Sequence, residues 1–64
     1  MLNKVGEAAG EIWRYLEGNG EIKIRNLAKA TKLNQKVTDR AIGWLLREGN
    51  VKVYENDQEE YISL

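Results

Sequence analysis

The chain contains no cysteine and no histidine among its 64 residues. Without cysteine, neither a disulfide framework nor thiol chemistry is available, which fits a reducing compartment. A glycine-rich phosphate loop is also absent, and the carboxylates stand in stretches that should face solvent, not in an apolar cleft. Carboxylates alone at irregular spacing do not make a metal site. We therefore expect no enzyme activity, no metal and no cofactor, and no feature indicates a small-molecule ligand.

Long apolar runs are missing as well. No run approaches the ~20 residues that a membrane-spanning helix needs, and the first ten residues lack the uninterrupted apolar core of a signal peptide. These absences predict a cytoplasmic protein that does not contact membranes. A chain this short is expected to form one domain, residues 1–64, and to bury only about 60% of the surface that its unfolded form exposes.

The net charge is zero, but the charges are unevenly distributed along the sequence. Residues 1–22 carry a net charge of −2, residues 23–40 carry +5, and residues 41–64 carry −3. If the protein binds a polyanion, the basic segment is expected to contact it. The alternative interpretation of the same lysines is a solvated face that keeps the protein soluble.

Three stretches have the apolar spacing of helices, at about residues 3–17, 25–31 and 35–48. In the first, Asn3 can act as the N-cap, and the apolar residues recur at offsets of three and four. Trp13 belongs to this apolar stripe, so we expect it in the core. Gly6 and Gly10 lie one turn apart in the same helix, and their lack of side chains allows another element to approach closely.

The third helix has an apolar side and a basic side. Asn34 is expected to cap it and Gly49 to end it, because glycine tolerates the left-handed C-terminal position. At 100° per residue, the inward side consists of Val37, Ala41, Ile42 and Leu45, and the outward side of Lys36, Arg40, Gly43 and Arg47. Trp44 and Leu46 fall on the two boundaries, where partial exposure is expected.

Alternating polar and apolar residues predict strands in two places. The stretch Glu21–Ile24 can form a very short strand before the second helix, and residues 51–64 can form a hairpin. A turn centred on Asp57 and Gln58 gives the cross-strand pairs Val51 with Leu64, Val53 with Ile62, and Tyr54 with Tyr61. Because the loop lacks glycine, a longer loop over residues 56–59 is an equally acceptable alternative.

This order of elements resembles that of winged helix-turn-helix domains over essentially the whole chain. The residues that carry the resemblance are Ile22, Ile24, Leu27, Ala28, Thr31 and Leu33, then Val37, Ala41, Ile42, Leu45, Glu48, Gly49 and Val51. The resemblance implies an α+β fold with three helices, a short strand and a C-terminal hairpin, called the wing. More narrowly, residues 5–13 and 41–49 look like a small prokaryotic family of stand-alone winged helix domains of unknown function. Two departures are Lys23, where such domains often have serine or threonine, and Lys32, where they often have glycine.

The resemblance also implies a partner, since DNA-binding relatives insert the outer side of the third helix into the major groove of double-stranded DNA. A role in transcription regulation would follow. The candidate DNA-binding residues are Arg25, Lys29, Lys32, Gln35, Lys36, Thr38, Arg40 and Arg47. Acidic residues at the wing tip argue against this partner, because they would approach the phosphates; they are Glu55, Asp57, Glu59 and Glu60.

A protein-interaction or dimerisation module is the alternative, because folds are reused for different functions. The candidate interface residues are Trp44, Leu46, Tyr54 and Tyr61. The two tyrosines also have a simpler interpretation, as a cross-strand pair that stabilises the hairpin.

Overall fold

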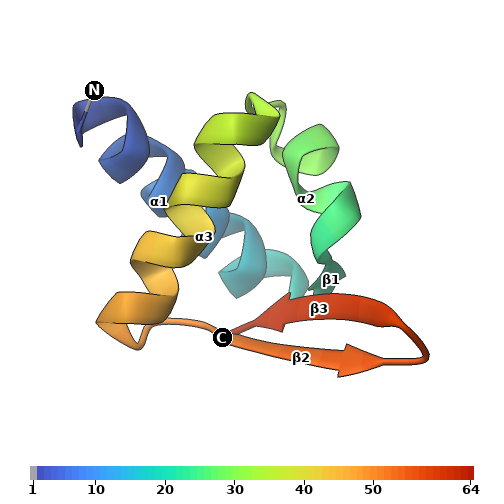
Figure 1. Ribbon diagram of the computed structural model, residues 1–64. Coiled ribbons are helices and arrows are strands. Elements are labelled where there is room, and N and C mark those ends of the chain that lie inside the picture. Colours follow the sequence, from blue (N-terminus) through green and yellow to red (C-terminus); the bar gives the residue numbers. More distant parts are fainter. Residues whose placement is uncertain (1) are drawn as a thin grey trace.

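A computed structural model describes the backbone of residues 2–64 and the side chains of residues 4–64. Over this range the elements are α1 (Leu2–Asn19), β1 (Ile22–Lys23), α2 (Ile24–Thr31), α3 (Gln35–Glu48), β2 (Lys52–Asn56) and β3 (Glu59–Ser63). The hairpin of β2 and β3 runs across one end of the helices, and its turn projects beyond them (Figure 1). The predicted α+β winged helix-turn-helix architecture is confirmed.

The first helix is longer than predicted and ends two residues later, at Asn19. The Asn19 side-chain amide donates to the Tyr15 carbonyl at 2.9 Å, which supports a further turn. The Gly20 amide then donates to the Leu16 carbonyl at 2.7 Å, with φ at +84°, so Gly20 ends the helix. Asn3 lies inside α1, and the expected cap made by its side chain falls outside the described residues.

The core joins all three helices to the central strand of the sheet. Its largest fully buried apolar side chains are Ile12 and Leu16 from α1, Leu27 from α2 and Ile62 from β3. Ala41, Ile42 and Leu45 bury the inner side of α3 against them. This packing orients α3, because burying one side of the helix leaves the opposite side facing outward.

The connection between α2 and α3 is a tight turn held by local hydrogen bonds. Lys32 adopts the left-handed conformation, with φ 60° and ψ 31°, and the Leu33 amide donates to the Ala28 carbonyl at 3.0 Å. The Asn34 side chain accepts from the amides of Lys36 and Val37 at 2.8 and 3.3 Å, which confirms the predicted cap. Lys23 makes no side-chain cap bond to α2. Because its φ is positive, Lys32 occupies the position of this turn that favours glycine.

The sheet has the strand order β1-β3-β2, with all pairs antiparallel. The predicted pairs of Val53 with Ile62 and Tyr54 with Tyr61 are confirmed. The turn itself is the tighter alternative, because Asp57 and Gln58 both have positive φ, at 53° and 65°, as in a two-residue primed turn. Five consecutive cross-strand pairs stabilise the hairpin and offset the unfavourable conformation of a non-glycine turn.

Candidate nucleic-acid interface

The outer side of α3 is open to solvent along its length. Lys36, Arg40 and Arg47 are exposed there, and Gln35 is exposed on the first turn of the same helix; all four are predicted DNA contacts. Gly43 lies among them, and a Cβ placed on it would meet no atom within 4 Å. The middle of this side is therefore flat, which allows a partner surface to approach the helix backbone closely.

Thr38 does not belong to this side, and the prediction that it contacts DNA is wrong. Its side chain is 0% exposed, and its hydroxyl donates to the Asn34 carbonyl at 2.9 Å. On the helical wheel Thr38 falls between Leu45 and Ile42, in the middle of the apolar side. Helical periodicity could have placed it in the core, and the hydroxyl is accommodated there because it is hydrogen-bonded within the helix.

Gln35 is positioned by a contact on its own helix. Its amide nitrogen donates to the Asp39 carboxylate at 2.9 Å, one turn further along α3. The pair is exposed, so the amide can exchange this partner for another acceptor. Asp39 also adds a negative charge to the outer side of the helix, a feature that disfavours a close phosphate at that point.

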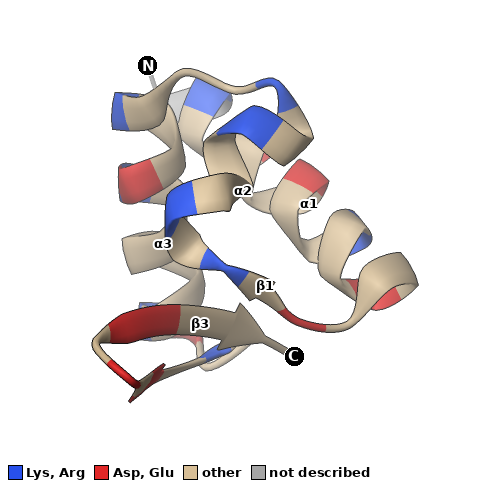
Figure 2. Cartoon of the chain, turned by 90° about the vertical axis from the view of Figure 1, so that its right-hand side faces the viewer, with Lys and Arg blue, Asp and Glu red and all other residues tan. Residues whose placement is uncertain are grey.

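The basic side chains outside α3 concentrate on α2 and on the turn that follows it. Lys29 and Lys32 are exposed. Lys36, on the first turn of α3, is also exposed and follows the same turn. In Figure 2 the blue segments follow α2 and the adjacent turn at the top of the view, while the red segments of the hairpin lie at the bottom. The structure thus separates these three lysines from the acidic wing.

Arg25 is the exception among the predicted phosphate contacts on α2. Its guanidinium forms an ion pair with the Glu59 carboxylate at 2.8 Å, linking the first turn of α2 to the start of β3. The arginine is exposed and the glutamate partly buried, so the pair contributes about 0–1 kcal/mol of stability. Its electrostatic consequence is larger, because the wing already neutralises this cation.

The wing carries an aromatic pair on one face. Tyr54 and Tyr61 stack with ring centroids 5.3 Å apart and planes inclined by 16°, as the cross-strand interpretation predicted. The Tyr54 hydroxyl donates to the Glu21 carboxylate. This hydrogen bond, together with partial desolvation and the negative charge of Glu21, raises the pKa of Tyr54 above 10.0. Tyr54 thereby ties the hairpin to the segment that precedes β1.

The predicted protein-interface residues do not form one patch. Trp44 and Leu46 are 48% and 44% exposed, as expected for boundary positions, but they lie on opposite sides of α3. Trp13, which was predicted to be in the core, is 36% exposed. It sits at the edge of the apolar stripe of α1, where it lines a hollow of about 690 Å³ together with Trp44. Sequence periodicity placed Trp13 on the stripe without indicating that α3 would leave its ring uncovered.

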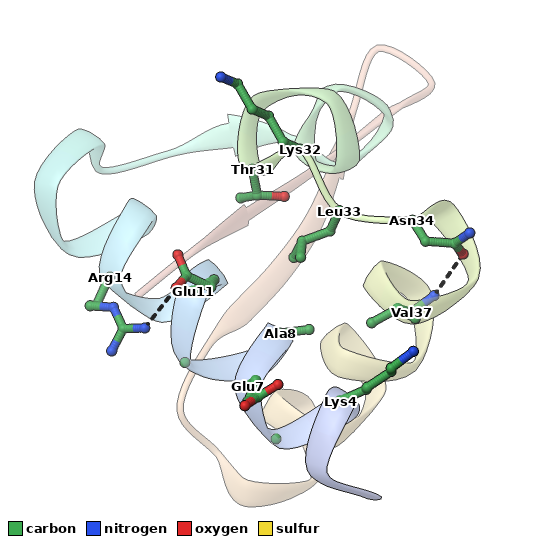
Figure 3. Close-up of a pocket in the computed structure, with 12 residues that line it drawn as sticks. Lys4, Glu7, Ala8, Glu11, Arg14, Thr31, Lys32, Leu33, Asn34 and Val37 are labelled. Atoms are coloured by element: carbon green, nitrogen blue, oxygen red, sulfur yellow. Dashed lines mark hydrogen bonds and ion pairs between the residues drawn. The ribbon is translucent and has the colours of Figure 1, made fainter. Parts of the chain in front are cut away.

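A second hollow, of about 780 Å³, lies between α1 and the turn that joins α2 to α3 (Figure 3). Ala8, Leu33 and Val37 supply apolar lining, and α1 supplies the charged side chains Lys4, Glu7, Glu11 and Arg14. Glu11 and Arg14 are paired with each other at 2.9 Å. Lys32 also lines this hollow, so charges of both signs border it and it adjoins the basic end of the molecule.

Among the residues that the structure describes, no three side chains of the metal-binding types lie close enough together to hold an ion. None of the helices in residues 2–64 combines the length and the apolar character that crossing a membrane requires.

Comparison with known proteins places the fold in a family. The model of the family described as "Winged helix-turn-helix domain (DUF2582)" matches residues 1–64. The uncharacterized protein MJ1608 of Methanocaldococcus jannaschii is 37% identical over 67 aligned residues, which cover 100% of this chain and 94% of that protein. The solution NMR structure of protein BT2368 from Bacteroides thetaiotaomicron is similar with a TM-score of 0.84 and 33% identity, covering 95% of this chain and 74% of that one. These similarities support the fold and bring no activity with them.

Proposed function

Because the chain belongs to the winged helix-turn-helix family DUF2582, we propose that it binds double-stranded DNA through the outer side of α3. The observation that supports this most directly is the group of exposed lysines at the helix-turn-helix: Lys29, Lys32 and Lys36. In Figure 2 basic segments of α2 and the adjoining turn lie toward the top of the view and the acidic segments of the hairpin toward the bottom. A cytoplasmic role in transcription regulation is part of the same proposal.

The proposed complex places the first half of α3 in the major groove. Arg40 and Gln35 carry the donors that read base edges, and an arginine in this position suits a guanine. Lys29, Lys32 and Lys36 meet phosphates and supply the salt-dependent part of the affinity. Arg47, on the last turn of α3, extends the same side of the helix. Gly43 allows the groove to come close, because no side chain projects there.

The wing takes no part in the phosphate contacts of this proposal. Its tip carries carboxylates that would repel the DNA backbone, and Glu59 holds the guanidinium of Arg25. We therefore leave Arg25 outside the direct contacts in the resting protein. The helices bind alone, and the hairpin points away from the duplex.

A titration of fluorescently labelled duplex at several salt concentrations tests the proposal. Three phosphate contacts predict that the logarithm of the association constant falls with the logarithm of salt concentration with a slope of roughly −3. An association too weak to detect at low salt would overturn the proposal. Selection from a random duplex pool then separates sequence readout from electrostatic binding.

Replacement of Arg40 distinguishes base recognition from phosphate contact. Arg40→Ala should cost about 1–3 kcal/mol of affinity for the selected sequence and much less for unrelated duplex. The thermal midpoint of the variant, measured alongside, shows whether folding is preserved. An equal loss on every duplex would assign Arg40 to the backbone and remove it from base readout.

A further inference from the structure

Asp39 places a carboxylate on the helix that the proposed function assigns to base reading. On the helical wheel it falls within about 60° of Lys36, at the border of the outer side of α3, and its side chain is exposed. A carboxylate at this point weakens the phosphate contacts around it, since like charges repel. Electrostatic attraction to DNA therefore does not account for this residue.

The Asp39 carboxylate binds a neutral partner although a cation is within reach. Lys36 lies three residues earlier, at a spacing that allows ion pairs on a helix. Among the side chains of residues 4–64, no ion pair forms between Asp39 and Lys36. The Asp39 carboxylate accepts instead from the Gln35 Nε2, at 2.9 Å. Asp39 thus orients an amide whose oxygen and second hydrogen remain available, because Nε2 carries two hydrogens.

A glutamine amide without such a partner reads bases ambiguously. Its terminal torsion is broad and roughly two-fold, so the oxygen and the nitrogen can exchange places. With Asp39 beside it, the exchanged orientation would set the Gln35 oxygen against a carboxylate, and both groups are acceptors. The amide nitrogen is therefore held toward Asp39 and the amide oxygen away from it.

The backbone that carries Gln35 is fixed as well. Gln35 is the first residue of α3, directly after the Asn34 cap. The cap side chain accepts from the Lys36 and Val37 amides at 2.8 and 3.3 Å. The cap carbonyl accepts from the Thr38 amide at 2.8 Å and from the Thr38 hydroxyl at 2.9 Å. Residues at the N-terminus of a recognition helix are those that reach base edges, so both ends of the Gln35 side chain are held where a base would be read.

We propose that Asp39 is a positioning residue that makes Gln35 specific for adenine. In the complex, one hydrogen of the Gln35 Nε2 stays with Asp39. The other donates to adenine N7, while the amide oxygen accepts from the adenine N6 amino group. Guanine presents an acceptor in place of that amino group, so the fixed amide oxygen opposes it. The inference rests on the proposed binding of DNA and adds the base that one side chain of that interface selects.

The same carboxylate weakens binding to unrelated DNA. Its repulsion of phosphates acts on every duplex, whereas its hydrogen bond to Gln35 favours only a duplex with adenine at the position that Gln35 reads. Asp39 therefore increases sequence discrimination and decreases affinity for unrelated duplex, which is how a repulsive element contributes to specificity.

The experiment first locates the base that Gln35 reads. Duplexes selected from a random pool are bound by the wild-type chain and by Gln35→Ala, and the position whose base preference disappears is assigned to Gln35. Four duplexes, one with each base at that position, are then titrated. The wild-type chain is expected to prefer adenine by roughly fivefold or more.

Two changes at Asp39 separate positioning from charge. Asp39→Asn keeps an oxygen acceptor for Gln35 and removes the charge, so the adenine preference should remain while all four duplexes bind a few-fold more tightly. Asp39→Ala removes the acceptor as well, so the preference should fall below about twofold. Unrelated duplex should bind the two variants equally tightly.

The control is Glu17→Gln, which removes a negative charge from the exposed side of α1 and should leave the preference unchanged. Thermal unfolding of each variant establishes that it is folded. An adenine preference that survives Asp39→Ala, or that Asp39→Asn also abolishes, would overturn the inference and leave DNA binding standing. So would a preference for another base at the Gln35 position, or a Gln35→Ala chain that keeps every preference. A wild-type chain that binds no duplex at low salt would overturn both proposals.

Discussion

The helix-turn-helix and the wing differ in whether their charged side chains are paired. Within residues 4–64, whose side chains are described, Lys29, Lys32 and Lys36 form no ion pair, whereas the wing engages Arg25 through Glu59. The wing also donates the Tyr54 hydroxyl to the carboxylate of Glu21, which precedes β1. A net charge of zero therefore describes a molecule with one cationic end available to a partner and one end occupied with internal contacts. Position along the fold, and not total charge, decides where an anion can bind.

Reversing one charge at the basic end should produce the largest effect on this contrast. Lys36→Glu should lower DNA affinity by at least about tenfold at low salt and reduce the salt slope by about one or more. Folding should be preserved, because an acidic residue in the first turn of α3 interacts favourably with the helix dipole. The measurement is the labelled-duplex titration, with Lys52→Glu on β2 as the matched control. Equal losses in the two variants would show that only total charge matters.

The unusual lysine in the turn allows stability and binding to be separated. Lys32→Gly should raise the free energy of unfolding by about 1 kcal/mol, because φ at 60° suits glycine. The same change removes a proposed phosphate contact and should weaken DNA binding. Lys32→Ala, which removes the charge and keeps the unfavourable conformation, should weaken binding equally without the gain in stability. Urea unfolding and the duplex titration measure the two effects, and a Lys32→Gly chain that binds as well as wild type would exclude Lys32 from the interface.

Releasing Arg25 from its ion pair should give the wing end an unpaired cation, as the helix-turn-helix end already has. Glu59→Gln removes the ion pair partner and should increase DNA affinity a few-fold, with a salt slope steeper by about one. Glu60→Gln removes the same amount of charge from the exposed part of the strand and provides the control. If both changes strengthen binding equally, the wing acts through its overall charge and not through Arg25.

The smallest expected effect concerns the tyrosine at the base of the wing. Because the Glu21 hydrogen bond raises the pKa of Tyr54, the protonated hydroxyl is favoured in the folded state. The corresponding stability is present below the unfolded pKa of about 10 and is lost as the pH rises through the higher folded pKa. Ultraviolet titration of the tyrosines should show one late ionisation, and Glu21→Gln should move it toward the ordinary value. Tyr54→Phe identifies the signal, and a late ionisation that survives this change would assign it to another tyrosine.

Much of the fold could be predicted because its signals are local. The limits of α3 agree with the prediction because Asn34 and Gly49 supply the cap and the stop within the segment itself. The hairpin register was predictable from the two alternating runs, which agree on the pairing of Val53 with Ile62. The family resemblance then added the arrangement of these elements.

The candidate site was less predictable, for two different reasons. The helical wheel would have predicted that Thr38 is buried, but its polar hydroxyl led to the prediction that it is exposed. The ion pair of Arg25 with Glu59 could not be predicted, because 33 residues lie between the two in the sequence. The exposure of Trp13 also depends on where α3 lies across α1, which no local pattern specifies.

The elements, their caps and the segregation of charge along the chain follow from local sequence, because each depends on residues within a few positions of one another. The tertiary structure decided which cations remain available, which aromatic rings stay uncovered and which strand occupies the centre of the sheet. Those properties depend on segments that meet only when the chain folds. The lysines of the helix-turn-helix and the carboxylates of the wing were visible in the sequence, and their separation to opposite ends was not.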